Sequence, residues 1–86
     1  MKVGKFELPF NVIRDEFEIA QEVMKKVVVT RAETLYHRNN AIEYIAISND
    51  FREIEEMELI PFYDVIVSKN NDKIDIKFKE VVNSGK

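Results

Sequence analysis

The chain has 86 residues, of which 45% are apolar and 34% charged, and its net charge is −3. A chain of this length forms one domain with a small core and leaves no room for a second core. It contains no cysteine, which excludes disulfides and thiolate metal sites. No apolar run approaches the ~20 residues of a membrane span, and the first residues show no apolar signal stretch, so we expect a cytoplasmic protein.

The composition favours a fold that is rich in β-strands. Valine, isoleucine and threonine together number 22, whereas leucine and alanine number only 7. β-Branched side chains lose rotamer freedom in helices and pack well on pleated surfaces. We therefore predict a single α+β domain over residues 1–82, with a frayed tail at 83–86. In this domain one main helix packs on a mostly antiparallel sheet of four to five strands built from two hairpins.

The N-terminal part of the chain predicts a short strand followed by the main helix. Residues 6–10 alternate between apolar and other side chains, and Pro9 prevents the strand ladder from continuing. Asn11 is expected to cap a helix over residues 12–26, where apolar residues recur at helical spacing. The members of this apolar stripe are Ile13, Phe17, Ala20 and Met24, widened by Val12, Ile19 and Val23.

Two asparagine pairs predict two β-hairpins. The first hairpin joins strands at 27–37 and 41–49 through a turn at residues 38–40. In the second, Asn70 and Asn71 are expected to form a two-residue loop. The pairs that follow from this loop are Val67 with Ile74, Val65 with Ile76, and Tyr63 with Phe78. All of these pairs are apolar and lie on one face, which supports the predicted hairpin.

The segment between the two hairpins is predicted to form a short helix. Asp50 and Glu53 have the spacing of a capping box, and the helix would span residues 51–57. An extended edge segment at 56–60 is the alternative. The side chains expected to face the core are Phe51, Ile54, and Met57 or the stem of Glu58.

The first hairpin carries apolar side chains on both faces, and this pattern predicts self-association. A single helix covers only one face of a small sheet, so the opposite face keeps exposed apolar groups. Such a patch is typical of an interface, and we therefore expect a homo-oligomer. In the alternative interpretation, the long strands twist and change sides at a bulge, and both faces are then covered within one chain.

The acidic residues are concentrated in the middle of the chain. Residues 43–64 contain seven acids against one base, whereas both flanking parts carry a small positive charge. A segment of this kind can steer binding to a basic surface, although a solvated, solubilising face is the simpler interpretation. The leading hypothesis is a small non-enzymatic, homo-oligomeric interaction protein. It would act as an adaptor, or as an inhibitor of a basic-surfaced protein, through an apolar sheet face and the acidic segment 50–58. The residues expected to bind this partner are Asp50, Glu53, Glu55, Glu56 and Glu58.

A second hypothesis is binding or sequestration of a small anionic ligand or nucleotide at a subunit interface. Aromatic and guanidinium groups stack on bases and hold phosphates, and several of them cluster around the first hairpin. The expected contacts are Arg31, His37, Arg38 and Tyr44. Ordinary cross-strand pairing of these side chains is the competing interpretation.

The sequence offers little for catalysis. It has one histidine, two glycines and three serines, and none of the serines lies in a Gly-x-Ser-x-Gly motif. These residues are too few for a nucleophile–base pair, a zinc site or a phosphate-binding loop. The clustered glutamates could act as an acid–base pair, but an exposed acidic surface explains them more simply. We expect no enzymatic activity, no cofactor and no bound metal.

Overall fold

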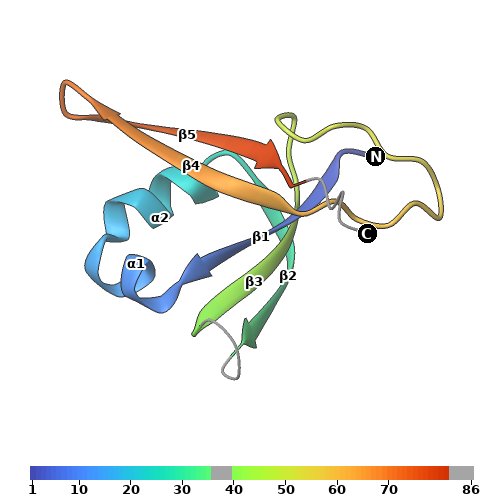
Figure 1. The fold of residues 1–86 in the computed structure, drawn as a ribbon, viewed down its shortest axis with the longest axis horizontal. Helices are drawn as coiled ribbons and strands as arrows, with labels where there is room; N and C mark the ends of the chain where they lie inside the picture. The colour runs from blue at the N-terminus through green and yellow to red at the C-terminus, as the bar shows by residue number, and fades with distance from the viewer. Residues whose placement is uncertain (36–39, 82–86) are drawn as a thin grey trace.

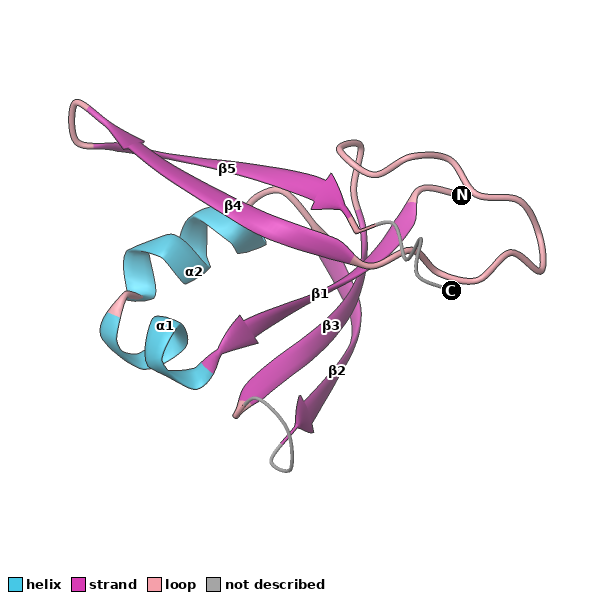
Figure 2. Cartoon of the chain, viewed as in Figure 1, coloured by secondary structure: helices cyan, strands magenta, loops and turns pink. Residues whose placement is uncertain are grey.

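The computed structural model describes residues 1–35 and 40–81, which form an α+β fold of two short helices and five strands in two antiparallel sheets (Figures 1 and 2). This confirms the predicted α+β class. The tail predicted at 83–86 and most of the turn predicted at 38–40 lie outside the described residues. The elements in chain order are β1 (Val3–Pro9), α1 (Phe10–Asp15), α2 (Phe17–Met24), β2 (Val28–Leu35), β3 (Ala41–Ile47), β4 (Tyr63–Asn70) and β5 (Lys73–Glu80).

The helical region is divided into two helices, whereas the sequence pattern predicted one. It begins at Phe10, so the predicted cap at Asn11 is wrong. Pro9 has extended backbone (φ −62°, ψ 149°), and the Phe10 N–H donates to the Asn40 carbonyl at 2.9 Å, which satisfies the helix start without a side-chain cap. Glu16 then leaves the helical region (φ −127°, ψ 55°) and separates α1 from α2.

This break changes which apolar side chains are buried. A continuous helix would align Phe17 with Ala20 on one apolar face. In the structure the buried residues of α2 are Ile19, Ala20 and Val23, whereas Phe17 is 59% exposed. The predicted stripe is therefore only partly buried, because the non-helical residue between the two helices removes the expected alignment.

The larger sheet has the strand order β1-β3-β2. β2 and β3 form the first predicted hairpin, and β1 pairs with the other side of β3, where Phe6 lies opposite Tyr44. The β2–β3 register shifts between Val29 and Arg31, which marks a bulge at Thr30. The bulge of the alternative interpretation is therefore present. However, residues 28–34 of β2 are all exposed, so it does not bring this strand into the core.

The second hairpin forms as β4 and β5, but the predicted register is wrong by two residues. The two-residue loop is Asn71-Asp72, with φ angles of 52° and 68°, the left-handed pair that a tight hairpin turn requires. The observed pairs are Val67 with Ile76, Val65 with Phe78, and Lys69 with Ile74. Because side chains alternate with a period of two, this shift leaves the apolar residues on the predicted face.

The helix predicted at 51–57 is absent, and a loop connects β3 to β4. The capping box does not form because its groups bind elsewhere. The Asp50 N–H donates to the Ser48 hydroxyl at 3.1 Å, and the Glu53 carboxylate pairs with the N-terminal amine. Phe51 is buried as predicted, but Met57 has a left-handed backbone (φ 71°) and is 97% exposed.

The core lies between the larger sheet, α2 and the β4–β5 hairpin (Figure 1). Its buried members are Phe6, Leu8, Ile19, Ala20, Val23, Ala46, Phe51, Tyr63 and Ile76. Among the described residues, one parallel bridge, between Lys5 and Phe62, pairs the backbones of the two sheets, and there the Lys5 N–H donates to the Pro61 carbonyl at 2.9 Å. Beyond this bridge β1 and β4 diverge (Figure 2).

Candidate functional site

The most exposed apolar side chains of the described chain lie in residues 49–61, which we name the acidic loop. This loop leaves β3 and projects from one end of the molecule before it reaches β4 (Figure 1). Met57 and Leu59 are 97% and 89% exposed, although both are large and apolar. Large apolar side chains that project from a surface in this way are typical of binding sites.

The acidic loop is held by a clamp centred on Arg52. The guanidinium Nη2 lies 2.8 Å from the Glu58 Oε2, and its Nε lies 2.8 Å from the Glu80 Oε1 at the end of β5. The Arg52 backbone N–H donates to the Tyr63 hydroxyl at 3.0 Å. Both ends of the loop are thus tied to the hairpin, while its tip remains exposed.

The structure places the five predicted acidic residues in two groups. Three of them pair within the chain: Asp50 with Lys26 at 3.8 Å, Glu53 with the N-terminal amine of Met1, and Glu58 with Arg52. The carboxylates of Glu55 and Glu56 are exposed and form no ion pair with any described residue. These two side chains are the ones that flank the exposed apolar tip.

Sequence reasoning missed the apolar pair at the tip because helical spacing placed either Met57 or the stem of Glu58 against the core. One signal argued against the helix. Glu56 and Glu58 would have stood at its C-terminal end, where the helix dipole disfavours negative charge. No comparable feature of the sequence indicated that Leu59 would be exposed.

The clamp predicts a pH-dependent loop. The hydrogen bond from Arg52 holds the pKa of the Glu58 carboxyl below its ordinary value, and the Glu55 N–H adds to this effect. A lowered pKa in the folded state means that the bond stabilises the loop above the unfolded pKa and is lost as the pH falls through the folded pKa. We expect the amide resonances of the loop to change in this acidic range in an NMR titration. The change at Arg52 and at residue 58 should be absent in Glu58→Gln, and a Glu58 that titrates at or above the value of free glutamate would contradict the clamp.

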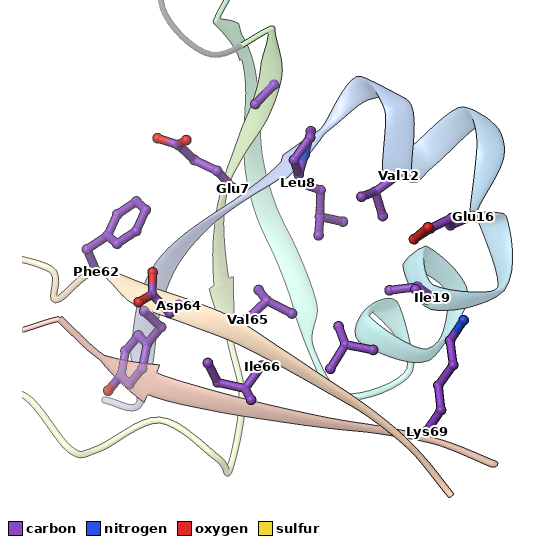
Figure 3. Close-up of a pocket in the computed structure, with 14 residues that line it drawn as sticks. Glu7, Leu8, Val12, Glu16, Ile19, Phe62, Asp64, Val65, Ile66 and Lys69 are labelled. Atoms are coloured by element: carbon purple, nitrogen blue, oxygen red, sulfur yellow. The ribbon is translucent and has the colours of Figure 1, made fainter. Parts of the chain in front are cut away.

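A second candidate surface is a groove of about 870 Å³ between the diverging strands β1 and β4 (Figure 3). Leu8, Val12, Ile19 and Val65 point into it, and Lys69 extends along its rim. These side chains give the groove an apolar floor. This apolar floor suits an apolar segment of a peptide or of another protein.

The backbone of β4 contributes to this groove. The Val81 N–H donates to the Phe62 carbonyl at 2.8 Å. In an antiparallel ladder the direction of the backbone groups alternates along the strand, so those of Val65 and Val67 point away from β5 and toward the groove. This edge is the kind of surface to which an extended peptide adds as a further strand.

The described structure does not gather the residues of the predicted anion or nucleotide site. Arg31 lies opposite Ile45 and Tyr44 opposite Ala32, so the two side chains project from opposite faces of the sheet. Tyr44 stacks on Phe6 with ring centroids 5.3 Å apart, and its burial raises the pKa of its hydroxyl. His37 and Arg38 lie outside the described residues.

Comparisons with protein-family models, curated proteins and solved structures found no match for this chain. Within residues 1–35 and 40–81, neither helix has the length and apolar character needed to cross a membrane. The acidic loop and the groove are therefore the features of the molecule that bear on its function.

Proposed function

We propose that the protein is a small non-enzymatic interaction protein. It associates with further copies of itself through its larger sheet, and it acts as an adaptor or inhibitor by binding a basic-surfaced protein. The observation that carries this proposal is the acidic loop, which presents Met57 and Leu59 almost fully exposed beside two glutamates that form no ion pair with a described residue. A monomeric protein gains nothing in stability from apolar side chains in this position. A partner with an apolar pocket would bury them.

The two kinds of side chain have different roles in this proposal. Met57 and Leu59 act as anchors, because burial of apolar area supplies most of the affinity at the centre of an interface. Glu55 and Glu56 steer the encounter and favour a pocket with a basic rim. The Arg52 clamp holds the loop before binding, which lowers the entropy that must be lost when the loop is ordered against a partner.

The proposal predicts that the two apolar anchors and the two glutamates contribute separately to the affinity for the partner. A tagged protein should retain a partner from a lysate of the producing cells, and this partner can then be purified for titration. Met57→Ser and Leu59→Ser should each weaken binding about tenfold or more at any salt concentration. Glu55→Gln with Glu56→Gln should weaken binding mainly at low ionic strength.

A matched control separates this effect from a general loss of apolar surface. Phe17 on α2 is also an exposed apolar residue, at 59%, and lies outside both the acidic loop and the groove. Phe17→Ser should leave partner binding unchanged. Retention of the partner by the double variant of Met57 and Leu59 would show that the loop is not the binding surface.

A further inference from the structure

The outer edge of β2 lacks a partner in the described part of the chain. β2 lies at the end of the β1-β3-β2 sheet and pairs only with β3 (Figure 1). Residues 28–34 are exposed, so both the side chains and the edge itself are accessible. An eight-residue edge strand of this kind presents backbone donors and acceptors to any strand that can align with it.

The charged residues of β2 are poorly matched within a single chain. Arg31 lies opposite Ile45, and no described carboxylate forms an ion pair with it. Glu33 lies directly opposite Glu43 in β3, and like charges in this relation are destabilising. Within residues 1–35 and 40–81, one chain therefore offers Arg31 no carboxylate and places two carboxylates side by side on the same face of the sheet.

We propose that two copies of the chain pair through their β2 edges, antiparallel around a two-fold axis at Ala32. In this register Arg31 of each copy lies opposite Glu33 of the other, so two complementary charge pairs form at once. The second copy's Arg31 also places a positive charge beside the repulsive pair of Glu33 and Glu43. The partner of this edge is thus a second copy of the same chain.

Symmetry leaves few other registers. Residues that lie opposite each other in an antiparallel pair project from the same face of the sheet, and side chains alternate between the two faces along each strand. The two-fold axis must therefore pass through a residue that lies opposite its own copy, and not between two neighbouring residues. An axis at Arg31 would place this arginine against itself, and an axis at Glu33 would do the same with two glutamates. Ala32, near the middle of the strand, is the position that gives long overlap with opposite charges facing each other.

The bulge sets the length of the proposed pairing. Thr30 lies outside the β2–β3 register, so the regular pairing covers residues 31–33 of each copy. At each end Thr34 lies opposite the bulged Thr30 of the second copy, whose hydroxyl already donates to the Ile45 carbonyl at 3.0 Å. This inference specifies the interface of the self-association included in the proposed function. It does not depend on the acidic loop.

Charge reversal tests the register directly. Arg31→Glu and Glu33→Arg should each place like charges opposite each other at both symmetry-related positions, and each should raise the dimer dissociation constant about tenfold or more. The double variant Arg31→Glu/Glu33→Arg restores both opposite-charge pairs and should dimerise like the original chain. An equimolar mixture of the two single variants should form a heterodimer, because one copy then carries only acidic and the other only basic side chains at these positions.

Sedimentation velocity over a wide range of protein concentrations measures these dissociation constants, and circular dichroism confirms that each variant is folded. Lys77→Glu, a charge reversal on the exposed side of β5, serves as the matched control and should leave dimerisation unchanged. A monomer at all concentrations would overturn the proposal. Dimers that persist in both single variants, or that the double variant fails to restore, would overturn it as well. Partner capture through the acidic loop is measured separately, so either proposal can fail while the other stands.

Discussion

Replacement of Phe51 by alanine is expected to destabilise the folded chain by about 3–5 kcal/mol, the usual cost of removing a fully buried aromatic side chain. Phe51 is only 2% exposed although it lies in the acidic loop. Its ring stacks on Tyr63 with centroids 4.6 Å apart and meets the edge of Phe78 at 4.9 Å. Its packing therefore holds the loop against the hairpin, in addition to the ion pairs of Arg52.

The size of this effect matters because a domain of this length has little stability in reserve, about 0.05–0.15 kcal/mol per residue. Urea denaturation followed by circular dichroism measures the change in the free energy of unfolding. Phe17→Ala is the matched control, since this phenylalanine is 59% exposed and its loss should change stability by no more than about 0.5 kcal/mol. Equal effects of the two substitutions would contradict the assignment of Phe51 to the core.

The second hairpin shows which structural features a local sequence pattern can predict. Alternating apolar residues identified both strands and the face that packs on the core, because strand periodicity is a local property of the sequence. The position of the turn was less certain, since Asn70, Asn71 and Asp72 all tolerate left-handed backbone better than most residues. The turn at Asn71-Asp72 and the predicted turn at Asn70-Asn71 bury the same side chains, so hydrophobicity cannot distinguish them.

The helical region and the acidic loop were predicted less well because distant contacts decide them. No glycine or proline marks the break at Glu16, and the helix start depends on a carbonyl that lies 30 residues away, at Asn40. In the acidic loop, the Glu53 carboxylate pairs with the N-terminal amine and does not form the predicted capping box. Arg52 donates a hydrogen bond to Glu80 at the far end of β5. Local propensity is too weak to outweigh such tertiary contacts.

The candidate site was accordingly predicted in part. The concentration of acidic residues in the middle of the chain was visible in the sequence, and it marks the loop that projects from the fold. The roles of individual residues were not visible, because ion pairs with Lys26, Arg52 and the N-terminus involve groups distant in sequence. The charge matching of β2 likewise emerges only when its register against β3 is known, since Glu43 is separated from Glu33 by the whole turn.

Gly4 lies where the fold leaves no room for a side chain. A Cβ atom on Gly4 would lie 2.7 Å from the Tyr63 Cε1 and 2.9 Å from the Phe51 Cδ2, distances that real Cβ atoms do not adopt. Gly4→Ala should therefore destabilise the protein by about 1–3 kcal/mol through overpacking. The reduced freedom of the unfolded chain opposes this by about 0.4–1 kcal/mol and does not reverse the sign.

A double-mutant cycle isolates this steric cause. In the Phe51→Ala background one of the two rings that crowd Gly4 is removed, and the cavity can accept the added methyl group. Gly4→Ala should then cost clearly less in the free energy of unfolding than it does in the original chain, so the two substitutions should not be additive. Urea denaturation of the four proteins gives the coupling energy. Strict additivity would mean that Gly4 is needed for its backbone and not for the close approach of these rings.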